Sequence, residues 1–389
     1  MFAKPQIRSF FNRLPMFAVM VLAQYETVSA QTAPGNSVTS LGVVHFDSES
    51  GFFKFASNNK LKIGGYVKAD AIVDLDRVGD TDRFDTRTIA TAGGDGNNFR
   101  LHARQTRLNL DYHHGDLRAF VEVDFFGPGS TVRLRQAYGQ WGGFTFGQTW
   151  STFVDPDVLP DLLDFEAPTG ALTTRRALVR YRRDLGDSWE VSASVEDPGE
   201  ITGLGFNGRV DSLLPDFVAE TKYQRDAMRF RLASFATVAR WRPDIGSIQD
   251  EFLWAVSGTG RIELSETDRL KFEVSYGDGL PKFRGISPVG FDRNGEFQAT
   301  TALAWMFAIE HNWTDQVSST VAYSQRDRSV QFSDLDDSIR RNQYLATNLL
   351  FRPNKHVTYG IEYLWGTREN ADSADGEAHR IMMSARYSF

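Results

Sequence analysis

The feature that most constrains the fold is a period-2 alternation of apolar and polar residues, repeated from about residue 60 to the end of the chain. The segment 269–277 reads RLKFEVSYG, and the segment 356–366 reads HVTYGIEYLWG. Successive side chains of a β-strand point to opposite faces, so each segment predicts a strand with one apolar and one polar face. Each is about ten residues long, the length that a tilted strand needs to cross the hydrocarbon of a membrane. The pattern therefore predicts an all-β protein.

Such segments can be placed sixteen times along the chain. The predicted strands are 60–75, 99–112, 117–126, 131–141, 143–149, 174–183, 189–196, 217–224, 228–238, 252–264, 269–277, 298–311, 317–326, 341–351, 356–366 and 378–389. Tight links with the Gly, Asp, Asn and Pro chemistry of hairpin turns alternate with long links, except at 127–130, where a short link replaces a long one. This alternation is the layout of a transmembrane β-barrel with both chain ends on the rim of short turns. We predict one antiparallel barrel over residues 60–389, with about sixteen strands and a counting error of about two.

The first thirty residues have the pattern of a secretory signal peptide. Their basic residues are Lys4, Arg8 and Arg13. A short apolar run follows at 14–23, and small residues at 28–30 form a cleavage site. The run is too short to span a bilayer, and charged, Gly or Pro positions interrupt every later apolar stretch. We therefore expect export across the inner membrane, a short periplasmic segment over residues 31–59, and membrane crossing by strands alone.

The last five residues, ARYSF, continue the alternation and close on a phenylalanine. This ending resembles the signature by which the barrel-assembly machinery recognises the last strand of an outer-membrane barrel. Tyr387 and Phe389 are the predicted assembly signal. The chain has 30 Phe, 12 Tyr and 8 Trp, yet its mean hydropathy is −0.36, as expected where one strand face meets lipid and the other meets water. It has no cysteine, which excludes disulfides and thiolate metal sites.

Arginine falls mostly on the polar, lumen-facing parity of the predicted strands. The predicted pore-lining arginines are Arg107, Arg118, Arg133, Arg135, Arg176, Arg180, Arg182, Arg229 and Arg231. A guanidinium facing lipid at mid-bilayer would cost about 2–4 kcal/mol, so these side chains are expected to point inward. Arginines bind carboxylate and phosphate groups, so a wall of them would favour small anions. Arg104 breaks the pattern, because its parity points outward, at a subunit interface or above a bulge.

The arginines have a simpler alternative explanation. Glu122, Asp124, Glu220 and Glu273 share the inward parity, so the interior could hold paired charges of both signs with a structural role. The sequence alone leaves both interpretations open.

The long link at 150–173 is the second candidate site. A loop of this length inside a compact domain usually has a function, and in a porin-like barrel it would fold into the lumen and narrow it. Its acidic residues are Asp155, Asp157, Asp161, Asp164 and Glu166. Facing the arginines, they would set up a transverse field across the pore. The alternative is an acidic extracellular loop, which could bind the divalent cations that bridge lipopolysaccharide.

Four short segments carry a resemblance to a known family. They are RQTRL at 104–108, EVDFFG at 122–127, RLRQAYG at 133–139 and FGQTWSTF at 146–153. With the aspartate-rich loop that follows, they resemble the DcaP-like porins, most strongly over about 60–185 and as strand pattern to Phe389. The resemblance implies a trimeric, sixteen-stranded outer-membrane channel with a positively charged constriction, favouring anions such as dicarboxylates. The chain departs from some members in its short N-terminal segment, where no coiled-coil heptad is found.

Other functions remain open at this stage. A general porin without selectivity or a phosphate-type porin would share the same barrel. An outer-membrane barrel enzyme needs a histidine with a serine or aspartate partner, and none of the seven histidines has a spacing that suggests one. A soluble all-β binding protein is the last alternative. We expect no catalytic residues, no cofactor, no metal and no nucleic-acid partner, and contacts with outer-membrane lipid and lipopolysaccharide.

Overall fold

The computed structural model describes residues 45–47, 51–55, 58–93, 95–201 and 208–389. These residues belong to one structural unit and contain β-strands and short 3-10 helices. Among them, no helix is long and apolar enough to cross a membrane. The predicted signal peptide at 1–30 and most of the predicted periplasmic segment at 31–59 lie outside the described residues.

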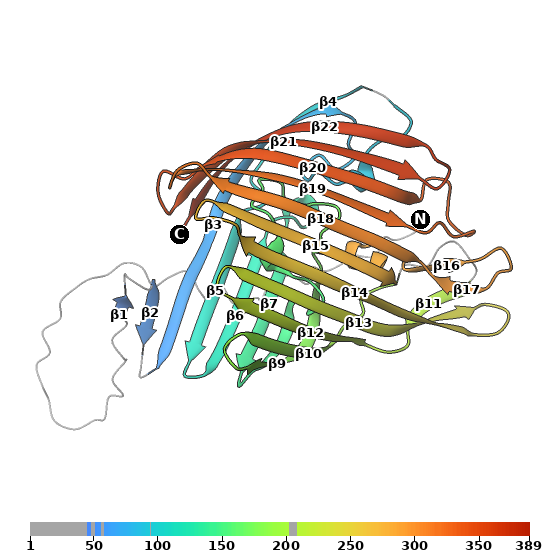
Figure 1. Ribbon diagram of the computed structural model, residues 1–389, viewed down its shortest axis with the longest axis horizontal. Helices are drawn as coiled ribbons and strands as arrows, with labels where there is room; N and C mark the ends of the chain where they lie inside the picture. The colour runs from blue at the N-terminus through green and yellow to red at the C-terminus, as the bar shows by residue number, and fades with distance from the viewer. Residues whose placement is uncertain (1–44, 48–50, 56–57, 94, 202–207) are drawn as a thin grey trace, which may run out of the picture. The chain divides into compact units, whose positions relative to one another are not determined.

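A closed antiparallel barrel of sixteen strands forms this unit (Figure 1). Fourteen strands are continuous: β3 (Asn59–Asp76), β6 (Leu117–Asp124), β7 (Arg133–Trp141), β8 (Phe144–Trp150), β9 (Arg175–Leu185), β10 (Trp189–Glu196), β13 (Met228–Pro243), β14 (Gln249–Glu263), β15 (Asp268–Asp278), β18 (Thr301–Asn312), β19 (Val317–Arg328), β20 (Ile339–Phe351), β21 (Val357–Asn370) and β22 (Asp375–Ser388). Two are interrupted: β4 (Asp95–His102) with β5 (Arg107–His114), and β11 (Gly208–Ser212) with β12 (Asp216–Arg225). The last strand, β22, pairs with β3 through Arg380↔Asp74 to Ser388↔Tyr66, so the main sheet closes on itself.

The strand prediction is confirmed, with sixteen strands at the expected places. The links predicted at 239–251 and 367–377 are shorter than expected, because the strands on both sides continue to pair beyond them; β13 alone has 16 residues. Two hairpins were not among the predicted strands, β1 (His45–Asp47) with β2 (Phe52–Phe55) and β16 (Val289–Phe291) with β17 (Phe297–Ala299). Their strands of three or four residues are too short for a period-2 signal.

Short links lie on one rim, which we call the turn rim, and longer links lie on the other, the loop rim. The turn-rim links are 115–116, 142–143, 186–188, 226–227, 264–267, 313–316 and 352–356. Along the strands, outward residues are apolar and exposed, as Val179 and Tyr181 of β9 show at 55% and 44% exposure, while Leu178, directly before Val179, points inward and is buried. Tyr387 and Phe389 also carry exposed side chains at the end of β22. The outer face is therefore an apolar surface suited to lipid.

Loops from the loop rim fill part of the barrel interior. The principal ones are residues 77–94, with 3-10 helix η1 (Thr86–Thr88); residues 151–174, with η3 (Pro156–Val158); and residues 279–300, with η4 (Leu280–Arg284), β16 and β17. The loop backbone reaches the wall directly at Gly170, where a Cβ atom would lie 2.1 Å from the carbonyl oxygen of Trp305. Only glycine allows this approach.

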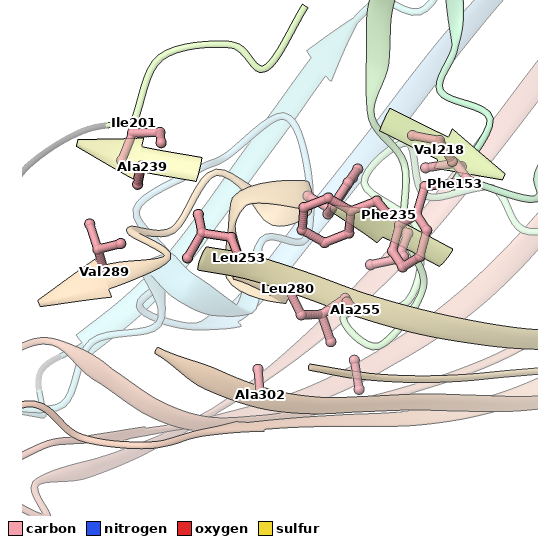
Figure 2. Close-up of a cluster of buried hydrophobic side chains, with 14 of the residues drawn as sticks. Phe153, Ile201, Val218, Phe235, Ala239, Leu253, Ala255, Leu280, Val289 and Ala302 are labelled. Atoms are coloured by element: carbon pink, nitrogen blue, oxygen red, sulfur yellow. The ribbon is translucent and has the colours of Figure 1, made fainter. Parts of the chain in front are cut away.

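Two of these loops build a hydrophobic core inside the barrel, on the side formed by β12 to β18 (Figure 2). Its centre is three aromatic rings: Phe153 from the 151–174 loop, Phe283 from η4 and Phe235 from β13. Their centroids are 4.6 to 5.3 Å apart. Such a dry core leaves no room for water or ions on this side of the interior.

Candidate functional site

The 151–174 loop is fixed in the lumen by wall side chains that bind its backbone. Four glutamates from four strands accept loop N–H groups: Glu196 from Thr152 (2.7 Å), Glu310 from Asp161 (2.9 Å), Glu362 from Leu163 and Asp164 (2.7 and 2.8 Å), and Glu273 from Leu172 (3.3 Å). Basic wall residues donate to loop carbonyls: Lys68 to Leu163 (2.6 Å), Lys271 to Leu159 (2.9 Å) and Arg231 to Thr152. Wall side chains thus supply the partners that a buried, irregular backbone needs. The predicted inward fold of this loop is confirmed.

Asp155 anchors the first half of the loop. Its carboxylate accepts two hydrogen bonds from Arg229 of β13, at 2.8 and 2.9 Å, and one from the hydroxyl of Thr259, at 2.5 Å. Asp157 approaches the same guanidinium at 3.1 Å. Burial alone would raise the pKa of Asp155, but the bonds from Arg229 hold it below its usual value. Arg229 and Asp155 therefore form a buried ion pair that ties the loop to the wall.

The remaining loop acids have separate partners. Asp161 pairs with Arg352 near the turn rim. Asp164 accepts a hydrogen bond from the backbone N–H of Phe84 at 3.0 Å and lies 3.4 Å from the Tyr344 hydroxyl; burial raises its pKa. Only Glu166 lines the cavity described below. The five acids thus do not face a single arginine wall, as the sequence suggested, but bind at different places around the interior.

The predicted arginines divide into four groups. Arg229 and Arg231 hold the loop, and Arg231 also pairs with Glu220 at 2.5 Å. Near the turn rim, Arg118 pairs with Asp111 at 2.8 Å and Arg182 with Glu190 at 3.5 Å. Arg176 and Arg180 share the inward parity of the buried Leu178 on β9, and no carboxylate of the described residues lies within ion-pair distance of either. The fourth group, Arg107, Arg133 and Arg135, lines a cavity.

This cavity has a volume of about 480 Å³ and lies between β5, β7, the start of β9 and the inward loops. Arg107, Arg133 and Arg135 surround the ring of Phe165, with guanidinium carbons 6.0, 5.5 and 5.3 Å from its centroid. A fourth arginine, Arg175, stacks on Trp150 at 3.7 Å. Aromatic faces attract guanidinium groups and hold them in place. The cavity is therefore basic and partly aromatic.

Carboxylates neutralise only part of this charge. Asp124 pairs with Arg133 and Arg135, both at 2.7 Å, and Glu122 pairs with Arg135 at 2.8 Å and lies 3.9 Å from Arg107. Among the described residues, Arg175 has no carboxylate within ion-pair distance, and the Nε atoms of Arg107 and Arg175 are buried without a hydrogen-bond partner. Four arginines thus face two carboxylates, which leaves positive charge and free donors in this part of the cavity.

The alternation rule for strands explains why some arginines that line the cavity were not among the predicted pore-lining residues. Arg175 has the outward parity of its strand, but it begins β9 directly after the loop and lines the cavity instead. Arg83, Arg87 and Arg284 also line the cavity, and they come from loops, where alternation gives no signal. Their positions depend on how three separate loops fold together.

Arg104 lies in the interruption between β4 and β5 and does not face lipid. Its guanidinium binds Asp82 of the 77–94 loop and donates to the carbonyl oxygens of Phe125 (3.3 Å) and Gly127 (2.8 Å). The parity rule fails here because the strand is broken at this residue.

No group of three His, Asp or Glu residues in the described part of the chain could hold a metal ion.

Comparison with known proteins agrees with this architecture. A family model described as DcaP outer membrane protein matches residues 49–389. The outer membrane channel DcaP of Acinetobacter baumannii aligns with a TM-score of 0.79 at 24% identity, over 87% of this chain and 99% of that chain. An anion-selective porin from Comamonas acidovorans gives a TM-score of 0.59 at 12% identity, over 85% and 100% of the two chains. The trimer form of OmpT from Vibrio cholerae gives 0.54 at 12% identity, over 86% and 100%.

The comparison with curated proteins finds no match. The family model, however, covers most of the chain, and the strands it covers close into the barrel. The chain therefore belongs to the DcaP outer membrane protein family and is a porin of the outer membrane.

Proposed function

We propose that the basic cavity is the constriction of the channel and that it selects small anionic, dicarboxylate-like solutes. The observation that carries this proposal is the excess of arginine over carboxylate at Arg107, Arg133, Arg135 and Arg175. Guanidinium groups bind carboxylates through paired N–H donors, and donors on opposite walls can hold the two ends of a short dianion. The Comamonas porin, similar in fold, is named as anion-selective, which agrees with the proposal.

A porin without selectivity is the main competing function, because Glu122 and Asp124 already neutralise much of the arginine charge. A phosphate-type channel would use the same arginines. Phe165 and Trp150 favour the dicarboxylate, because their apolar faces accommodate the carbon skeleton between two carboxylates, which a phosphate ion lacks.

Removing Arg133 and Arg135 together should abolish anion selectivity. The double variant Arg133→Ala/Arg135→Ala deletes two positive charges and leaves Glu122 and Asp124 without those partners. We expect the reversal potential in a KCl gradient to fall close to zero, because removing two of the four arginines that face two carboxylates leaves no excess positive charge at the constriction. The matched control, Arg293→Ala/Arg340→Ala, removes two exposed arginines from the loop rim and should keep the wild-type potential. A wild-type channel that prefers potassium would contradict the proposal.

We also propose that the protein is a homotrimer, assembled by the barrel-assembly machinery through the Tyr387 and Phe389 signal and surrounded by lipid and lipopolysaccharide. The exposed apolar outer face and the trimer form of OmpT, a porin of similar fold, support this proposal. We expect the detergent-extracted protein to migrate on gels as a trimer until it is boiled, because closed barrels resist unfolding by detergent. Migration as a monomer before boiling, with crosslinking giving no trimer, would contradict it.

A further inference from the structure

Glu166 lies where the three inward loops meet. Its carboxylate is 3.1 Å from Arg83 and 3.2 Å from Arg87, both of the 77–94 loop. It is also 3.4 Å from Arg284 of η4, in the 279–300 loop. Glu166 itself belongs to the third loop, 151–174, directly after Phe165. One carboxylate therefore forms ion pairs with three guanidinium groups from two other loops.

Its three arginines differ in their other partners. Arg83 also pairs with Asp80 at 2.5 Å, and Arg87 also pairs with Asp85 at 2.7 Å. Arg284 is buried, and within the described part of the chain Glu166 is the only carboxylate within ion-pair distance of it. Its side chain otherwise donates to the Thr173 hydroxyl at 2.9 Å, and its Nε atom is buried without a partner. Removing the Glu166 charge would thus release Arg284 above all.

The residues that line the cavity connect Glu166 with the transport of solutes. Seven arginines line the cavity: Arg83, Arg87, Arg107, Arg133, Arg135, Arg175 and Arg284. Glu166 is the single acidic residue among the lining residues. Asp124 and Glu122 pair with cavity arginines from the barrel wall behind them, whereas Glu166 lies on the surface that a solute would contact. It occupies the position that a carboxylate of a bound solute would take.

We propose that Glu166 is a built-in counter-ion that sets how tightly the constriction binds anions. A channel needs a site strong enough to attract its solute and weak enough to release it. Seven converging arginines would hold a dianion for long times. The Glu166 carboxylate competes for three of them, lowers the positive potential, and so speeds release. This inference rests on the proposed anion selectivity.

The test uses Glu166→Gln in the full-length protein, in planar bilayers. We expect the dwell time of succinate to lengthen about tenfold, which is the effect of removing one charge about 6 Å from a dianion in water-like screening. The dwell time of acetate should lengthen about threefold, because the interaction scales with the charge of the solute. The permeation rate of the neutral sugar ribose into liposomes should stay the same. Glu166→Asp, which keeps the charge, should restore dwell times close to wild type.

The matched control is Glu296→Gln, which removes the same charge from an exposed position in the 279–300 loop. It should leave the succinate dwell time unchanged. If Glu166 only holds the loops together, Glu166→Gln will change ribose permeation as well, with no dependence on solute charge, and the inference fails. Unchanged dwell times in an anion-selective wild type would also overturn it. A cation-selective wild type would instead contradict the proposed function on which the inference rests.

Discussion

Arg229→Ala should give the largest change in conductance of any single substitution in the barrel wall. It breaks the buried pair with Asp155 and leaves that carboxylate with neutral hydrogen-bond donors, the Thr259 hydroxyl and the backbone N–H of Asp157. Removing one member of a buried pair destabilises by about 3–5 kcal/mol, because the other charge remains buried without compensation. We expect the first half of the loop to leave the wall and the single-channel conductance in KCl to rise about two- to threefold, since the constriction limits ion flow.

Arg240→Ala is the control on the same strand. Arg240 pairs with Asp250 at 2.5 Å, but Asp250 is exposed and Arg240 partly exposed, and ion pairs that are open to solvent contribute little to stability. This variant should conduct like the wild type. If Arg229→Ala folds and keeps wild-type conductance, then the Asp155 anchor does not hold the constriction in place.

Lys282→Ala should give the largest loss of stability. The Lys282 ammonium of η4 lies 2.6 Å from both carboxylate oxygens of Asp216 on β12, and both side chains are at most 2% exposed. The ammonium also lies 5.3 Å from the Phe235 ring, beside the hydrophobic core. The substitution leaves Asp216 charged and buried, which costs about 3–5 kcal/mol. When samples are heated stepwise before electrophoresis, we expect the variant to change from the folded to the unfolded gel mobility at a lower temperature than the wild type.

The double variant Lys282→Met/Asp216→Leu separates charge from packing. Replacing both members of a buried pair by apolar residues of similar size is often neutral, so this variant should recover most of the lost stability. If the double variant unfolds as early as Lys282→Ala, then the pair contributes to stability mainly through its hydrogen-bond geometry, and the charge argument is wrong.

The barrel was predictable because its signal is local. Alternation in a segment such as 269–277 places each side chain inside or outside, whatever the rest of the chain does. The same rule identified Arg133 and Arg135, which flank the outward-facing Leu134 at the start of β7. It failed at Arg104 and Arg175, because one lies in a strand interruption and the other at the junction of a strand and an inward loop.

The interior was much less predictable, because it depends on loops meeting one another. The alternation predicted a polar lumen, and no local pattern showed that Phe153 and Phe283 would meet in a dry core. Parity placed Glu273 in the interior, but its role in binding the loop backbone needs the position of the loop. The same holds for Glu196, Glu310 and Glu362, which the sequence alone did not single out. For the same reason Arg284 could not be linked to Glu166, which lies 118 residues away.

The anchoring of the loop by wall glutamates has a consequence for the order of folding. The N–H of Leu163 binds Glu362, 199 residues further along the chain, on the last strand but one. Contacts between distant residues form late, because closing a long loop of chain is entropically costly. We therefore expect the barrel to be nearly closed before the loop tip docks. During biogenesis the pore would thus begin wide and leaky, and it would acquire its filter only when synthesis, export and strand pairing are complete.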